Sequence, residues 1–332
     1  MVHGYPPYHN AGAEWMLHDL NKFLVKRGHD VLVLIPGGDA VTRKNGKREM
    51  KKVEQRFELD GVRVEAITTK NGLASFKWCD LVVTHLDMTG KVMNIVRRPD
   101  VHKPIVHLLH NTHHNHAIEV LNPKNQYVVY NAEWNRKENR YKNRGIVVHP
   151  PVAMDDYKVI RRNAQNITLV NCWKNKGGNV LVELAKTMPD HKFLGVMGGY
   201  GDQTIGRRKN LKYEENTPDI KSIYRKTRII IMPSEYESWG RVAVEAMCSG
   251  IPVIAHPTPG LKESLDFAGL FAHRDRVGEW QKHIEDLDDP EYYDKISTLC
   301  KRRAAELDKM SHNELYEYEK FLHTISQKGY AV

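Results

Sequence analysis

One stretch of the sequence, residues 228–260, constrains the fold more than any other. It begins with an apolar run led by β-branched isoleucines, which is typical of a buried strand in a parallel sheet. Gly240 opens a segment with apolar residues at helical spacing, Gly250 ends that segment as a C-cap, and a second apolar strand follows at 252–256. This order predicts an α/β fold, in which the first loop lies at the carboxyl end of a parallel sheet, where such folds bind ligands.

The loop and helix of this stretch carry residues suited to a nucleotide sugar. A helix that begins near Gly240 directs its first N–H groups, at 239–242, towards the loop, where its dipole favours a phosphate. Arg241 adds a positive charge there. An acid does not bind phosphate, so we expect Glu237 and Glu245 to bind hydroxyl groups of a sugar or a ribose. The plain alternative is that Glu237 caps the helix and Glu245 is solvated.

The segment EYESWGRVAVEAMCSGIPVIA resembles the signature of retaining glycosyltransferases of family 4. The resemblance implies the GT-B fold: two Rossmann-like doubly wound α/β domains facing across a cleft, with a C-terminal helix that crosses back to the first domain. It implies that Glu237 contacts the donor sugar and that Glu245 holds the ribose. It is strong at 233–260 and only an outline before residue 100. The donor-binding residues expected in this segment are Ser238, Trp239, Gly240, Arg241 and Glu245.

The length of 332 residues is enough for two domains of ordinary size. Pro150 and Pro151 interrupt regular structure where relatives carry an interdomain hinge. We therefore expect an acceptor-side domain at 1–152, a nucleotide-sugar domain at 153–310, and a C-terminal helix at 311–332 that packs back on the first domain.

The first domain contains two expected site residues. Gly12 precedes an apolar helical stripe and is similar to the family's Gly-Ala-Glu loop across the cleft from the donor phosphates. His110 ends an apolar strand and matches the family histidine that faces the donor sugar. The sequence departs from the family pattern before this loop, because only residues 1–3 stand where relatives have a full first strand. Residues 39–56 are expected to form a mobile loop, and the Asp60-Gly61 pair predicts a hairpin.

The second domain contains the expected diphosphate residues. The family has an arginine at the end of a strand and a lysine before a glycine turn, both of which grip the diphosphate. Lys176 matches the lysine, whereas Asn171 stands in place of the arginine. Lys174 or Arg241 is expected to compensate. The alternative for Lys176 is an ordinary solvated turn residue. Towards the C-terminus, amphipathic helices are expected at 276–287, 290–309 and 312–328.

No metal site is expected from the sequence. The histidines at 107–116 do not keep the spacing of a known zinc motif, and no thiol or acid joins them. No metal-binding Asp-x-Asp motif precedes the end of the sheet either, as expected if the helix N-terminus and Lys176 stabilise the leaving diphosphate. No cofactor is expected beyond the donor itself, a UDP- or GDP-linked sugar. The four cysteines are scattered and are expected to be free thiols in a reducing cytoplasm.

The net charge of +9 raises the question of an anionic partner. Basic residues cluster at 43–52, 135–144 and 207–212, either as plain solvated faces or as a surface for a polyanion. The first cluster contains Arg43, Lys44, Lys47, Arg48, Lys51 and Lys52. Candidate acceptors are hydroxymethylated bases of DNA, as for phage glycosyltransferases, a lipid at a membrane surface to which the protein binds peripherally, and a small molecule or protein.

The function that the resemblance implies is transfer of a sugar from a nucleotide diphosphate to a hydroxyl, with the anomeric configuration kept. Because no carboxylate nucleophile is evident, the family's front-face mechanism is expected, in which the leaving phosphate takes the acceptor proton while His110 and Glu237 orient the sugar. Two rivals remain: a nucleotide-sugar epimerase of the same architecture, and a catalytically silent nucleotide-binding or scaffold protein. Turnover without an acceptor distinguishes the first, and absence of donor turnover the second.

Overall fold

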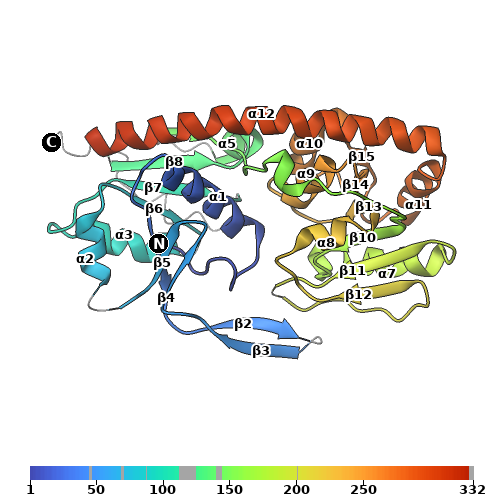
Figure 1. Ribbon diagram of the computed structural model, residues 1–332, viewed down its shortest axis with the longest axis horizontal. Coiled ribbons are helices and arrows are strands. Elements are labelled where there is room, and N and C mark those ends of the chain that lie inside the picture. Colours follow the sequence, from blue (N-terminus) through green and yellow to red (C-terminus); the bar gives the residue numbers. More distant parts are fainter. Residues whose placement is uncertain are drawn as a thin grey trace. The chain divides into compact units, whose positions relative to one another are not determined.

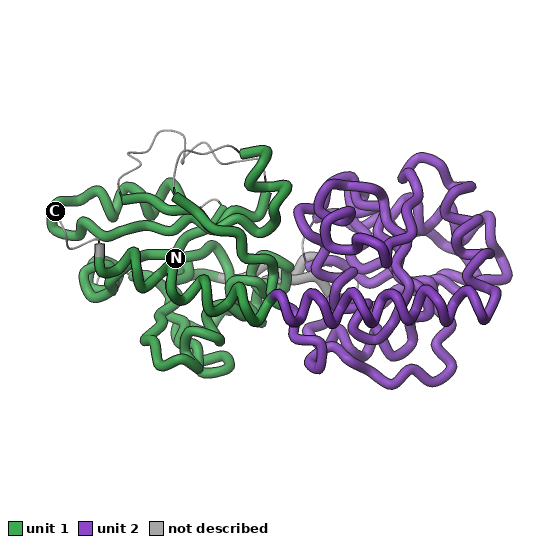
Figure 2. The backbone as a smooth tube through the Cα atoms, turned by 90° about the horizontal axis from the view of Figure 1, so that it is seen from above, with its two compact units in different colours: residues 1–40, 50–151, 311–332 green, residues 41–49, 152–310 purple. Residues whose placement is uncertain are grey.

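The computed structural model describes residues 1–44, 47–68, 71–86, 88–111, 125–139, 144–199 and 201–328, with the backbone alone at 39–51. The chain divides into two compact units (Figure 2). Unit 1 comprises residues 1–40, 50–151 and 311–332, and unit 2 comprises residues 41–49 and 152–310.

Unit 1 contains two sheets, ordered β1-β5-β4 and β6-β7-β8-β9 (Figure 1). The strands are β1 (Leu32–Pro36), β4 (Arg56–Leu59), β5 (Val62–Ile67), β6 (Val82–His85), β7 (Ile105–Leu109), β8 (Gln126–Tyr130) and β9 (Arg144–Val147). All neighbours pair in parallel except β4 and β5, which form the hairpin predicted from Asp60-Gly61. Every residue of β7 is buried, as expected for a central strand covered on both faces.

Helices complete the core of unit 1. They are α1 (Gly12–Lys26), α2 (Gly72–Trp78), α3 (Met88–Val96), α5 (Glu133–Asn139) and the last turns of α12 (Pro290–Lys328). Tyr318, Leu322 and Ile325 recur at helical spacing on α12 and are buried in one cluster with Leu20 of α1 and Val64 of β5. Burying an aliphatic side chain of this size contributes about 1.5–3 kcal/mol, so this face holds the end of α12 on unit 1.

Residues 1–3 do not form a strand, but hydrogen bonds fix the first two. The N–H of Val2 donates to the carbonyl of Leu34 in β1 at 3.0 Å, and the ammonium of Met1 donates to the carbonyl of Val83 in β6 at 2.8 Å. The chain then turns into the loop that leads to α1.

Unit 2 contains one parallel sheet, ordered β12-β11-β10-β13-β14-β15. Its strands are β10 (Asn166–Val170), β11 (Lys192–Val196), β12 (Leu211–Glu214), β13 (Thr227–Met232), β14 (Val253–Ala255) and β15 (Leu270–Phe271). Its helical segments are α6 (Met154–Tyr157), η2 (Lys174–Lys176), α7 (Gly178–Thr187), α8 (Ile220–Tyr224), α9 (Arg241–Cys248), α10 (Pro259–Leu265), η3 (Asp266–Ala268), α11 (Val277–Asp286) and the first part of α12.

The order of the strands in unit 2 determines where a ligand site can form. From β10 the chain continues to β11 on one side, while β13 pairs with β10 on the other. The direction of winding therefore reverses between β10 and β13, which is the position where open parallel sheets bind ligands. The segments that leave this point are the loop after β10 and the loop after β13.

Two expectations about secondary structure were wrong. Residues 39–56 do not form a loop, because β2 (Asp39–Lys44) and β3 (Lys47–Lys52) pair as a two-stranded ribbon. The expected helices at 290–309 and 312–328 form one continuous helix, α12. Neither Pro nor Gly stands between the two stretches, so nothing in the sequence ends the first helix. None of the helices in the described part of the chain is long and apolar enough to cross a membrane.

Candidate active site

The loop after β13 and the loop after β10 bring Glu237 and Lys176 together in unit 2. The ammonium of Lys176 lies 2.5 Å from Oε1 of Glu237, and the hydroxyl of Ser234 donates to the same oxygen at 2.9 Å. The side chain of Glu237 is 15% exposed. Among the described residues, Oε2 of Glu237 has no hydrogen-bonding partner. That oxygen is therefore able to accept from a hydroxyl group of a ligand.

Glycines shape both loops. Gly240, the N-cap of α9, has φ of +87°, and a Cβ there would lie 2.5 Å from Cδ2 of Leu261. Gly177 precedes α7 with φ of +96°, and a Cβ there would lie 2.2 Å from Cγ of Pro233. Both positions need the left-handed conformation and the absence of a side chain. The two loops approach each other because of these residues, and the N–H of Glu235 donates to the carbonyl of Asn175 at 2.8 Å.

Glu245 and Arg241 form a buried pair on α9. The Nε of Arg241 lies 2.7 Å from Oε1 of Glu245, and both side chains are 8% exposed. The hydroxyl of Tyr224 donates to Oε2 of Glu245 at 2.8 Å, and Nη2 of Arg241 donates to the hydroxyl of Tyr157 at 2.8 Å. Burial, followed by the charge of Glu245, raises the pKa of Tyr224 well above its usual range. Tyr224 is therefore a permanent donor to Glu245.

The neighbouring predicted residues lie at the start of the same helix. Trp239 is buried, and Ser238 is half-buried beside it. Gly260 packs on this loop so closely that a Cβ there would lie 2.4 Å from the carbonyl oxygen of Glu237. The first N–H groups of α9 have no partner within the helix, as at any helix start. The roles predicted for Ser238, Trp239 and Arg241 in donor binding stay predictions.

The backbone conformation explains why asparagine is present at position 171, where the family has an arginine. Asn171 adopts φ of +72°, a region that favours asparagine over most residues, and its Oδ1 accepts from the N–H of Trp173 at 3.1 Å.

Arg274, which the sequence reasoning missed, lies beside the loops after β10 and β13. Its Nη2 donates to the carbonyl of Lys174 at 3.3 Å, and its Nη1 lies 3.5 Å from a carboxylate oxygen of Glu235. The side chain of Arg274 is 14% exposed.

In unit 1, His110 is held by a second histidine at the ends of neighbouring strands. The Nδ1 of His85, the last residue of β6, lies 3.0 Å from Nε2 of His110, which follows β7. Burial, followed by the charge of His3, lowers the pKa of His110 to about 3. Burial, followed by His110, holds the pKa of His85 well below its usual range. Both imidazoles are therefore neutral at physiological pH, and one donates to the other.

The remaining predicted residues of unit 1 are placed as follows. Gly12 is the first residue of α1, and a Cβ there would meet no described atom within 4 Å, so the backbone at this point is open to approach. His107 is buried on β7 and lies 3.0 Å from Oε1 of Gln126. The histidines at 113, 114 and 116 lie outside the described residues.

Sequence signals existed for some of the missed residues and not for others. His85 ends one strand as His110 follows the next, and parallel strands end at one edge of a sheet, so the pair was open to prediction. Tyr224 precedes Glu245 by 21 positions and lies on another helix, and nothing in the local pattern links the two.

A family model described as "Glycosyl transferases group 1" matches residues 173–301. A D-inositol 3-phosphate glycosyltransferase of Paenarthrobacter aurescens is 32% identical over 83 residues, which cover 24% of this chain and 19% of the relative. One from a Mycobacterium species is 27% identical over 169 residues, covering 42% of this chain and 38% of the relative. The chain thus spans about two fifths or less of the length of these relatives.

The comparison with solved structures covers nearly the whole chain. Sucrose-phosphate synthase from Thermosynechococcus elongatus matches with a TM-score of 0.76 at 15% identity, covering 98% of this chain and 96% of that one. Anabaena HepE in complex with UDP and glucose matches with a TM-score of 0.71 at 17% identity, covering 95% and 99%. The expected fold class is confirmed by these structures. The chain therefore has the GT-B fold, and its residues 173–301 match the family model of the glycosyl transferases group 1.

Proposed function

We propose that the protein is a retaining glycosyltransferase that moves a sugar from a nucleotide-diphosphate sugar to an acceptor hydroxyl. The observation that carries the proposal is the Glu237 carboxylate at the switch point of a parallel sheet. Lys176 and Ser234 hold its Oε1, while Oε2 has no partner in the described part of the chain. A carboxylate fixed through one oxygen presents the other to the hydroxyl groups of a donor sugar. The structurally similar HepE was solved in complex with UDP and glucose, which supports a UDP-linked donor for this protein.

The leaving diphosphate is stabilised by charges of unit 2. Lys176 is the last residue of η2, two residues before α7 begins at Gly178, and the N-terminus of α9 follows the loop that carries Glu237. Arg274 adds a guanidinium to the same loops, which supplies the charge that Asn171 lacks. Preorganised charges of this kind stabilise developing negative charge without a divalent ion at the diphosphate. Addition of Mg²⁺ or Mn²⁺ to chelator-treated protein is then expected to leave the rate unchanged.

Transfer with retention proceeds by attack on the same face of the sugar from which the diphosphate leaves. The bond from the anomeric carbon to the phosphate oxygen breaks, the acceptor oxygen bonds to that carbon, and the acceptor proton passes to the leaving phosphate oxygen. His110 and Glu237 orient the sugar. Because His110 is neutral, it contributes hydrogen bonds rather than a positive charge.

The acceptor is proposed to be anionic. The two strands of the β2–β3 ribbon carry one anion, Glu49, and six cations. The cations are Arg43, Lys44, Lys47, Arg48, Lys51 and Lys52. Six minus one gives +5 over residues 43–52. Binding of duplex DNA containing hydroxymethylated bases would release counterions, so its affinity is expected to fall steeply between two salt concentrations. Binding to anionic vesicles, with no shift of DNA even at low salt, would favour a lipid acceptor instead.

The activity is tested by a screen of nucleotide sugars by thermal shift, followed by mass spectrometry of turnover. Lys176→Ala is expected to reduce turnover about 100-fold or more, as for loss of one group that stabilises an oxyanion. Lys186→Ala is the control, because Lys186 is an exposed lysine of α7 that pairs with Glu183. If the protein binds a donor but neither transfers the sugar to any acceptor nor hydrolyses the donor, the catalytically silent alternative is indicated.

A further inference from the structure

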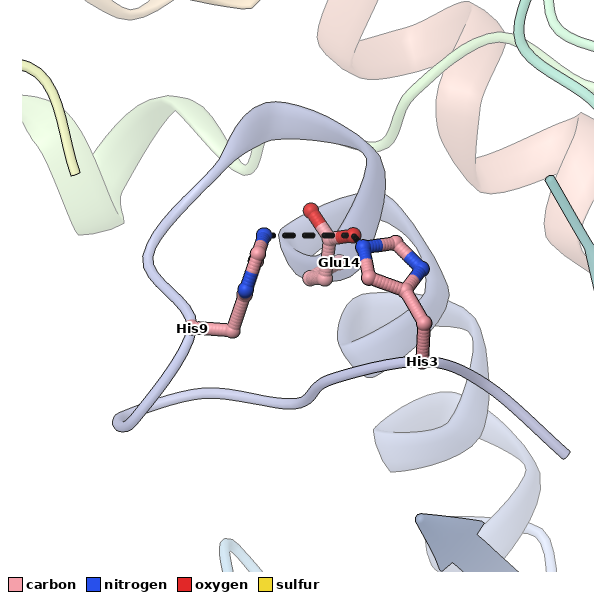
Figure 3. A group of neighbouring side chains, drawn as sticks. All are labelled: His3, His9 and Glu14. Carbon is pink, nitrogen blue, oxygen red and sulfur yellow. Dashed lines mark ion pairs between the residues drawn. The ribbon is translucent and has the colours of Figure 1, made fainter. Parts of the chain in front are cut away.

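Three side chains at the start of unit 1 converge on one point. None of them has a role in the sugar transfer proposed above. His3 and His9 lie in the loop before α1, and Glu14 lies in the first turn of that helix (Figure 3). The Nε2 of His3 is 3.2 Å from Oε1 of Glu14, and the Nε2 of His9 is 3.8 Å from the same oxygen. The three ligand atoms all lie within 4.8 Å of one another.

These separations suit a small transition-metal ion. A tetrahedral zinc ion with bonds of about 2.0–2.1 Å places its ligand atoms about 3.3 Å apart. The two distances to Oε1 bracket that value, and the separation of the two imidazole nitrogens, at most 4.8 Å, exceeds it by no more than about 1.5 Å. Two imidazoles and one carboxylate are a set of ligands that zinc uses in sites which keep a fourth position for water.

The surroundings of Glu14 favour a cation. Its side chain is 2% exposed, and ionised carboxylates are rarely buried without a partner. Within the described ranges, His3 and His9 are the residues that form ion-pair contacts with Glu14, and no lysine or arginine does so. A neutral imidazole supplies no positive charge to the carboxylate. A bound divalent ion would supply that charge and would also bind the Nε2 atom of each of the two histidines.

The backbone of the loop is built to bring the two histidines together. A Cβ at Gly4 would lie 2.8 Å from Cβ of His9, so a larger residue at position 4 would displace His9. The rings of His3 and His9 meet edge to face with centroids 4.9 Å apart. On the other side of His3, the ring of His85 lies 5.7 Å away, and its buried Nε2 has no hydrogen-bonding partner among the described residues.

We propose that His3, His9 and Glu14 bind one zinc ion through Nε2, Nε2 and a carboxylate oxygen, with the fourth position open to water. The ion would fix the loop of residues 3–9 to the first turn of α1. This site lies in unit 1 and is independent of the diphosphate-binding residues of unit 2, so it does not rest on the proposed function.

The test uses the full chain, stripped with a chelator and dialysed against zinc chloride. Elemental mass spectrometry is expected to find about one zinc per chain. Glu14→Gln and His9→Gln are each expected to lower zinc affinity by more than the roughly 10- to 100-fold that loss of an outer-shell partner costs. Circular dichroism verifies that each variant is folded. Cobalt in place of zinc is expected to give the absorption of a site with nitrogen and oxygen ligands, without thiolate bands.

Two controls separate this site from other histidines and from the cysteines. His102→Gln changes an exposed histidine of unit 1, and the triple variant His113→Gln, His114→Gln, His116→Gln removes the histidines of the other histidine-rich segment. Both controls are expected to retain the ion. Absence of bound zinc in the parent, or equal stoichiometry in the parent, Glu14→Gln and His9→Gln, would overturn the proposal. Loss of the ion in the triple variant alone would assign it to residues 113–116 instead.

Discussion

The Nδ1 of His85 lies 3.0 Å from the Nε2 of His110, and both rings are buried at the ends of neighbouring parallel strands. One ring must donate and the other accept, so this contact exists only between neutral rings or between one neutral and one charged ring. Burial makes the neutral pair the stable form. His85 therefore fixes the orientation of the ring that we propose to face the donor sugar.

We expect His85→Gln to reduce kcat with little change in KM for the donor. Loss of one hydrogen bond of this kind costs about 0.5–1.5 kcal/mol, which corresponds to roughly 2- to 12-fold in rate. Steady-state kinetics measures the two parameters separately. A role of His85 in folding alone would instead reduce the amount of active enzyme, so that kcat per folded molecule would equal that of the parent. His102→Gln is the matched control on the surface of the same unit.

The buried histidines of unit 1 are expected to make its stability depend on pH. The pKa of His107 is lowered to about 4 by burial, although its bond to Gln126 opposes the shift. A histidine with a lowered folded pKa contributes stability that is fully present above about 6.5 and is lost as the pH falls towards the folded value. Denaturant unfolding of the parent between pH 7 and pH 4 should therefore show a falling free energy of unfolding.

His107→Gln isolates the contribution of one ring. Its free energy of unfolding is expected to change less steeply over the same range, by up to about 1.4 kcal/mol per pH unit. Glu14 has a pKa raised to about 7 by burial and acts in the opposite direction, but it is common to both proteins and cancels in the difference. Parallel curves for the parent and the variant would show that His107 does not titrate on unfolding.

Glu245→Ala is expected to have two effects that can be measured separately. It should weaken binding of the bare nucleotide diphosphate by roughly 10- to 100-fold, because a hydrogen-bonded carboxylate in a ligand site contributes about 1.5–3 kcal/mol. It should also destabilise unit 2 by about 3–5 kcal/mol, because Arg241 is left as a buried charge without its partner. Calorimetric titration and denaturant unfolding test the two effects.

Tyr224→Phe serves as the control for Glu245→Ala. It removes one hydrogen bond to Oε2 and retains the ion pair with Arg241. We expect a loss of stability near 1 kcal/mol and a nucleotide affinity close to that of the parent. If Glu245→Ala unfolds more easily but binds nucleotide as the parent does, Glu245 has a structural role and the ribose assignment is wrong.

Arg274→Ala is expected to slow transfer by about 10- to 100-fold, since its guanidinium is proposed to replace the charge that Asn171 lacks. Arg276→Ala is the matched control, because Arg276 is an exposed residue two positions later that pairs with Glu279. Single-turnover measurement of donor cleavage reports the effect on the chemical step. Equal rates for the two variants would show that Arg274 has no part in stabilising the diphosphate.

The sequence by itself determined the fold class and the local structure around Glu237. The alternation of apolar strands and helices between 228 and 260 allows one arrangement in a parallel sheet, and the loop position of Glu237 follows from it. The hairpin at Asp60-Gly61 was predictable for the same reason, since a two-residue turn between alternating strands acts locally.

The tertiary structure decided which distant residues meet. Lys176 and Glu237 are 61 positions apart and are joined because β10 and β13 are neighbours, which no local pattern expresses. The contact of Glu245 with Tyr224 on α8 and the group of His3, His9 and Glu14 likewise depend on packing. The continuity of α12 and the β2–β3 ribbon were missed for a related reason. Charged and polar stretches have weak intrinsic preferences, and their pairing or packing selects the conformation.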